Sequence, residues 1–116
     1  MADTDIETLI GDYIAAWSEP DPAARRRLLE SAWDDEGTYT DPVSHAANRA
    51  GLDAIIEQFH ADNPGARFAR KDKLDTHHGH IRFYWVLTFA NGINMTGMDY
   101  GEISPRGKLV KIVGFF

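Results

Sequence analysis

The 116-residue sequence contains no cysteine, which excludes disulfides, thiol catalysis and zinc–thiolate sites together. Long apolar runs are also missing, and the longest is only a few residues, too short for a transmembrane helix. The acidic start, MADTDIETLIGD, lacks the basic region and apolar stretch of a signal peptide. We therefore expect a cytoplasmic protein that does not use a membrane.

Basic residues are few, with 12 Lys and Arg against 18 Asp and Glu and a formal charge of -6. This balance disfavours nucleic acid as a partner, because phosphate binding needs a basic surface. The densest basic stretch, Arg25 to Arg27, predicts a solvated helix face. Apolar residues make up 43%, and the length suits a single domain over residues 1–116 with one core.

Apolar spacing predicts three helices in the first half of the chain. The first ends near Ser18, because prolines follow, and its apolar face comprises Ile6, Leu9, Ile10, Tyr13, Ile14 and Trp17. Asp21-Pro22 is typical of a helix start, so a second helix is expected from there to about Trp33. A third is expected at 52–62, ended by Asn63-Pro64-Gly65.

The second half predicts strands. Residues 38–40 form a short β-type run and 43–49 a loop, after which strands are expected at 66–75, 80–89, 93–103 and 108–116. Residues 80–89 alternate strictly between apolar and mixed side chains, and Asn91-Gly92 is typical of a hairpin turn. Helices followed by an antiparallel meander indicate an α+β fold. A strongly curved sheet over three helices would leave a concave pocket.

Three polar residues are candidates for chemistry. Asp99 lies in the middle of a strand, on the same face as Met95 and Ile103, where an unpaired carboxylate is costly and its pKa rises. Asp41 ends a short strand before a proline, and Tyr13 lies on the apolar face of the first helix. The alternatives are an Asp99 that reaches water, an Asp41 that only stabilises its turn, and a Tyr13 that is a core residue.

The remaining candidates are weaker. Trp17, Trp33, Phe59 and Trp85 are most simply core residues, and would form walls if a pocket exists. His45 follows Asp41 and could reach a pocket mouth. A metal at His77, His78 and His80 is disfavoured, because Arg82 shares the strand face and would repel a cation. No metal or other cofactor is expected.

Four segments resemble the nuclear-transport-factor-2-like superfamily, in its SnoaL-like and ketosteroid-isomerase-like branch: DYIAAW at 12–17, TYTDPV at 38–43, GLDAIIEQF at 51–59 and GMDYGEISPRGKLVKIVGFF at 97–116. The resemblance implies a conical α+β barrel of the cystatin-like type. Its three N-terminal helices pack in the concave face of a strongly bent antiparallel sheet. It also implies a homodimer through the outer sheet face, here the face with His80, Arg82, Tyr84 and Val86.

The resemblance further implies roles for the three polar residues. Asp41 matches the general base, and Tyr13 and Asp99 match the two donors that stabilise an enolate, so proton transfer beside a carbonyl is implied. Isomerase and polyketide-cyclase reactions both fit, on a small hydrophobic ligand. The expected pocket residues are Trp17, Trp33, Phe59, Trp85, Met95, Ile112 and Phe116, with His45.

The sequence also departs from the isomerases. Trp33 and Phe59 stand where those enzymes place further tyrosines beside the oxyanion tyrosine. The aspartate before proline also occurs in SnoaL-like proteins without isomerase activity. A non-catalytic ligand-binding or dimerisation module is therefore the alternative.

Overall fold

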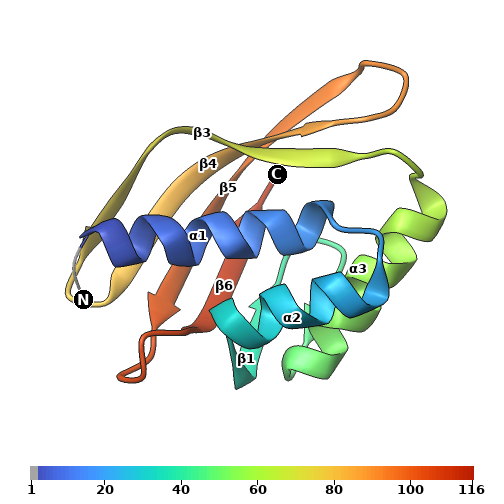
Figure 1. Ribbon diagram of the computed structural model, residues 1–116. Coiled ribbons are helices and arrows are strands. Elements are labelled where there is room, and N and C mark those ends of the chain that lie inside the picture. Colours follow the sequence, from blue (N-terminus) through green and yellow to red (C-terminus); the bar gives the residue numbers. More distant parts are fainter. Residues whose placement is uncertain (1–2) are drawn as a thin grey trace.

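The computed structural model describes residues 3–116, which form three helices and one six-stranded sheet. The helices are α1 (Asp3–Ser18), α2 (Pro22–Ala32) and α3 (Arg49–Asp62). The strands are β1 (Trp33–Thr40), β2 (His45–Ala46), β3 (Arg67–His77), β4 (His80–Thr88), β5 (Asn94–Ile103) and β6 (Leu109–Phe115). All three helices lie on the same side of the curved sheet, and α1 runs across its strands (Figure 1). The α+β fold expected from the sequence is confirmed.

Two details of the expected sheet are wrong. The strand order is β2-β1-β6-β5-β4-β3, and β1 pairs with β6 in parallel, so the sheet is mixed and not purely antiparallel. The two edge strands, β2 and β3, do not pair with each other, so the curved sheet stays open and no barrel closes. A parallel pair needs a long crossover connection, which the chain between β1 and β6 supplies with α3 and four strands.

The helix boundaries follow the capping residues. Asp21 begins α2 by accepting a 2.9 Å hydrogen bond from the amide of Ala24. Asn48 caps α3 in the same way through the amide of Gly51, so this helix starts earlier than predicted. The second helix ends before Trp33, which becomes the first residue of β1. The loop expected at 43–49 contains the two residues of β2.

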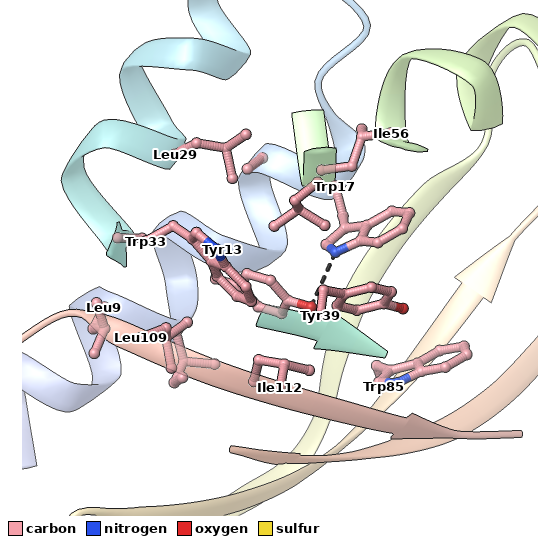
Figure 2. Packing of buried hydrophobic residues seen from close by; sticks show 14 of the residues in the cluster. Leu9, Tyr13, Trp17, Leu29, Trp33, Tyr39, Ile56, Trp85, Leu109 and Ile112 are labelled. Carbon is pink, nitrogen blue, oxygen red and sulfur yellow. Dashed lines mark hydrogen bonds between the residues drawn. The ribbon is translucent and has the colours of Figure 1, made fainter. Parts of the chain in front are cut away.

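The core lies between α1 and the inner face of the sheet. Ile10, Tyr13 and Trp33 are almost completely buried, and Figure 2 shows Tyr13 and Trp33 beside Leu109 of β6. The predicted alternation in β4 is confirmed, because Ile81, Phe83, Trp85 and Leu87 are all buried. Within residues 3–116, no helix has the length and apolar character that a membrane span needs.

Arg25 contradicts the prediction of a solvated arginine face. Its side chain is 0% exposed, and its Nε donates to Asp53 of α3 over 2.6 Å. It also donates to the carboxylate of Glu57 and to the carbonyl of Glu19. A buried guanidinium thus joins α2, α3 and the α1–α2 turn, because its several donors can each be satisfied there.

Candidate functional site

A cavity of about 440 Å³ lies between the inner face of the sheet and helices α1 and α3. Its walls are largely aromatic, with contributions from Trp17, Phe59, Phe68, Trp85, Phe89 and Phe116. Figure 2 shows Trp17 and Trp85 on either side of Tyr39. Such a lining with a few convergent polar groups is typical of a site for a small organic ligand.

Four polar groups meet in this cavity: Tyr13 from α1, Tyr39 from β1, Asp41 just after β1, and Asp99 from β5. The two aspartates converge over Gly114 of β6, which faces Asp99 in the β5–β6 ladder. A Cβ atom at Gly114 would lie 3.0 Å from Asp99 Oδ1 and 3.4 Å from Asp41 Cβ. The absence of a side chain there leaves room for both aspartate side chains beside β6.

Asp99 is held almost entirely away from water, with only 5% of the residue exposed. Its Oδ1 accepts a 3.1 Å hydrogen bond from the indole nitrogen of Trp85. Burial raises the pKa of Asp99 to about 7. Hydrogen bonds from Trp85 and Tyr13 oppose this rise, and the charge of Asp41 adds to it. Near neutral pH the Asp99 carboxyl can therefore hold a proton and donate it.

Asp41 has a different environment. It is half-buried, and both of its carboxylate oxygens accept hydrogen bonds. Tyr39 Oη donates to Oδ2 over 2.6 Å, and the amide of Val43 donates to Oδ1 over 2.9 Å. A donor on each oxygen thus fixes the orientation of this carboxyl group at the wall of the cavity.

The hydroxyl of Tyr13 lies at the deep end of the cavity. The residue is 1% exposed, and its oxygen accepts a 3.0 Å hydrogen bond from Trp17 Nε1, drawn as a dashed line in Figure 2. Its ring stacks on Trp33 with 5.5 Å between ring centroids. Burial, and then the charge of Asp99, raises the pKa of Tyr13 well above its ordinary value. The hydroxyl therefore stays protonated and can act as a donor.

The structure brings most of the predicted site residues to this cavity: Tyr13, Asp41, Asp99, Trp17, Phe59, Trp85, Met95 and Phe116. Three predicted wall residues are wrong. Trp33 is fully buried behind Tyr13, and its indole nitrogen donates to the carbonyl of Gly37. Ile112 is buried in the core next to Gly101. His45 is exposed and its Nδ1 lies 2.9 Å from the hydroxyl of Thr40.

Sequence reasoning missed Tyr39 and Phe68. Tyr39 precedes Asp41 by two residues, and the alternation of a strand places such residues on the same face, so the signal was present. Phe68 lies in a polar strand whose pairing with β4 brings it opposite Leu87. Only that long-range register places Phe68 in the wall. Among the described residues, no three His, Cys, Asp or Glu side chains form a metal-binding group.

A curved open sheet over three helices, with two aspartates in an aromatic cavity, characterises this chain, and solved structures resemble it closely. A proposed isomerase of the SnoaL-like family from Agrobacterium tumefaciens str. C58 is 33% identical, with a TM-score of 0.89 over 97% of both chains. This chain belongs to the SnoaL-like family of the nuclear-transport-factor-2-like superfamily.

Two more distant structures share the fold alone. An NTF2-like protein of unknown function from Exiguobacterium sp. 255-15 is 16% identical, with a TM-score of 0.73 over 91% of this chain and 95% of its own. A cystatin-like-fold protein from Methylobium petroleophilum PM1 is also 16% identical, with a TM-score of 0.81 over 99% of this chain and 77% of its own. No protein-family model and no curated protein sequence matches the chain.

Proposed function

We propose that this protein binds a small hydrophobic carbonyl compound and transfers a proton at the carbon beside the carbonyl, without a cofactor. The observation that carries the proposal is the pair of carboxyl groups over Gly114, which have opposite tasks. Asp99 has a pKa of about 7 and can donate, whereas Asp41 is only half-buried and accepts one hydrogen bond on each oxygen. Pairs of acids whose environments separate their proton affinities are typical of acid–base sites.

In the proposed reaction, Asp41 takes a proton from the α-carbon of the substrate. The electron pair of the broken C–H bond moves into the new C=C bond, and the carbonyl oxygen becomes the enolate oxygen. Tyr13 and protonated Asp99 donate hydrogen bonds to that oxygen, where the negative charge develops. In a substrate with a further C=C bond conjugated to the enolate, return of the proton from Asp41 to the far carbon of that bond gives an isomer. Attack of the enolate carbon on a second carbonyl instead forms a C–C bond and closes a ring, and the alkoxide formed at that carbonyl takes the proton from Asp41.

The charges of the cavity limit the ligand. Its described lining contains Asp41, Asp62 and Asp99, and no Lys, Arg or His. An anionic ligand would lose its hydration without gaining a counter-charge, which is costly in an apolar pocket. The proposed substrate is therefore a neutral ketone, enone or poly-ketone with an aromatic or alicyclic body.

The test is turnover of neutral ketones of this kind by the wild type and by Asp41→Asn, Asp99→Asn and Asp5→Asn variants. Asp41→Asn should lower kcat by about 10²–10⁴-fold, the usual contribution of a general base. Asp5→Asn is the matched control, because Asp5 is exposed on α1 and outside the cavity lining, and its kcat should stay near the wild-type value. Wild-type turnover in Asp41→Asn would contradict the proposed base.

A second function has one observation in its favour. Tyr13 accepts a hydrogen bond from Trp17 and stacks on Trp33, where the isomerases place further tyrosine hydroxyls. A site with fewer hydroxyl donors stabilises an enolate less, and suits a protein that only binds its ligand. Native mass spectrometry of the purified protein distinguishes the two functions. A retained ligand that is never converted, with binding that survives Asp41→Ala, would favour the binding module.

We also propose that the protein is a homodimer that pairs through the outer sheet face. Tyr84, Met98 and Phe115 lie directly opposite one another on β4, β5 and β6 and form an apolar row. Tyr84 is 47% exposed and Phe115 is 53% exposed. A second copy would cover these aromatic side chains, which is a usual role for apolar groups left on a surface.

A further inference from the structure

Tyr39 is a buried cavity residue to which the proposed proton transfer gives no task. Only 6% of it is exposed, and its ring packs against Trp17 with 5.5 Å between ring centroids. Its hydroxyl donates to Asp41 Oδ2 over 2.6 Å, a length typical of a hydrogen bond to a charged oxygen. This is also the shorter of the two hydrogen bonds that the carboxylate accepts from Tyr39 and Val43.

The position of this hydroxyl gives it influence over both acids. A Cβ atom at Gly114 would lie 3.7 Å from Tyr39 Oη, beside the two carboxyl groups that converge there. Tyr39 therefore lies at the meeting point of Asp41 and Asp99, but its hydrogen bond goes to Asp41 alone among the described contacts. Asp99 instead receives the indole N–H of Trp85.

We infer that Tyr39 is a positioning residue that keeps the negative charge on Asp41 and thereby leaves the proton of the acid pair on Asp99. Asp41 and Asp99 line the same cavity, and the charge of Asp41 raises the pKa of Asp99, so the two carboxyl groups resist being charged together. The carboxyl group that is better solvated or hydrogen-bonded then ionises first. The hydroxyl of Tyr39 donates to Asp41 Oδ2, which accepts best when the carboxyl group is charged. This hydrogen bond therefore favours ionisation of Asp41 over ionisation of Asp99. The assignment of Asp41 as base rests on the proposed function, whereas the division of charge does not.

Few other ionisable groups can compete for this role. The titratable side chains that face Asp41 in the cavity are Tyr13 from α1, Asp99 from β5 and Asp62 at the end of α3. Strand β6 contributes Gly114, which has no side chain. Tyr39 itself stays protonated, because burial and the hydrogen bond to Asp41 raise its pKa far above the ordinary value. It therefore acts as a fixed donor throughout the range in which the acids titrate.

The test is carbon-13 NMR of the aspartate carboxyl carbons as a function of pH, in the wild type and in Tyr39→Phe. The variant keeps the ring that packs on Trp17 and removes only the hydroxyl. The titration midpoint of Asp41 should rise by about one pH unit, a roughly tenfold change in proton binding, because a hydrogen bond to a charged group contributes on this order. Tyr84→Phe is the control, since Tyr84 is an exposed tyrosine on the outer sheet face.

An unchanged or lower midpoint for Asp41 in Tyr39→Phe would overturn the inference. Tyr13→Phe provides the converse comparison, and should move the titration of Asp99 more than that of Asp41. If Tyr39→Phe does not fold, a measurement on the wild-type protein still tests the inference. The hydroxyl proton of Tyr39 should exchange with solvent far more slowly than that of free tyrosine, and exchange at the rate of free tyrosine would show that the hydrogen bond to Asp41 is not maintained and would overturn the inference.

These measurements need no substrate, so their outcome is separate from that of the proposed function. Failure of the proposed function would appear as turnover that is insensitive to Asp41→Asn, or as no turnover of any neutral ketone. Failure of the present inference would appear as aspartate titrations that do not respond to the Tyr39 hydroxyl. Each can occur without the other.

Discussion

Gly97 lies directly opposite Trp85 in the β4–β5 ladder, and the indole of Trp85 occupies the space where a side chain at Gly97 would stand. A Cβ atom at Gly97 would come within 2.1 Å of Trp85 Cζ2, far inside van der Waals contact. In this orientation the indole nitrogen reaches Asp99 two residues further along β5. A glycine on one strand thus positions the donor that the buried acid uses.

The substitution Gly97→Ala should therefore displace Trp85 and weaken its hydrogen bond to Asp99. Overpacking of this kind costs about 1–3 kcal/mol, so the free energy of unfolding in urea should fall by that amount. The near-ultraviolet circular dichroism of tryptophan should change as well. The control is Gly11→Ala in α1, where a Cβ atom meets nothing within 4 Å. That change should stabilise the protein slightly, by about 0.5–1 kcal/mol; equal stability of the two variants would contradict the argument.

Arg25 gives the second prediction. Arg25→Ala removes a fully buried guanidinium and leaves Asp53, with a side chain only 17% exposed, paired with the exposed Arg26 alone. Breaking one side of a buried pair is strongly destabilising, and we expect a loss of about 2–4 kcal/mol in the free energy of unfolding. Arg27→Ala on the same helix is the control. Arg27 is exposed, and its removal should change stability by less than about 0.5 kcal/mol.

Local patterns in the sequence were sufficient for the helices and for the inner face of β4, because each depends on residues close together in the chain. Arg25 shows the limit of these local patterns. Nothing in the run of three arginines distinguishes the one that faces α3, since that depends on Asp53 and Glu57, far along the chain. The predicted cavity-wall position of Trp33 is wrong for a similar reason. The strand that begins at Trp33 pairs with β6, the last strand of the chain, and local spacing does not show this pairing.

The candidate site was predictable in part. The resemblance named Tyr13, Asp41 and Asp99, and the structure brings these three residues into one cavity. It did not include Tyr39, although the two-residue spacing of Tyr39 from Asp41 indicates a shared strand face. Spacing alone does not predict the hydrogen bond between the two side chains, which also depends on strand twist and side-chain orientation.

The proposed dimer gives a third prediction. Tyr84→Asp places a charge in the middle of the apolar row on the outer sheet face, where burial by a second copy would be costly. Sedimentation should show a wild-type dimer and a Tyr84→Asp monomer. The control is Val43→Asp, which also replaces an exposed apolar residue by an acid but lies at the cavity rim. It should remain a dimer, and a monomeric wild type would contradict the proposed interface.

The fourth prediction concerns pH and the buried acid. The pKa of Asp99 is about 7 in the folded protein, against an ordinary value of 3.8. Between these values the folded state binds more protons than the unfolded state, so the free energy of unfolding falls as pH rises. The contribution of protonated Asp99 to the free energy of unfolding is fully present below about pH 4 and is lost above about pH 7. The full difference is on the order of 2–4 kcal/mol.

The measurement is the free energy of unfolding in urea from pH 4 to pH 8, for the wild type and for Asp99→Asn. Asparagine stays neutral and keeps an oxygen that can accept from Trp85, so the variant should lack the decline. Arginine partners lower the pKa values of Asp34 and Asp75, so the stabilisation that these two carboxylates contribute to the folded protein is lost as pH falls. Both proteins share that opposite trend, so subtracting one curve from the other isolates Asp99. A difference between the curves that does not change with pH would show that Asp99 titrates as an ordinary carboxyl.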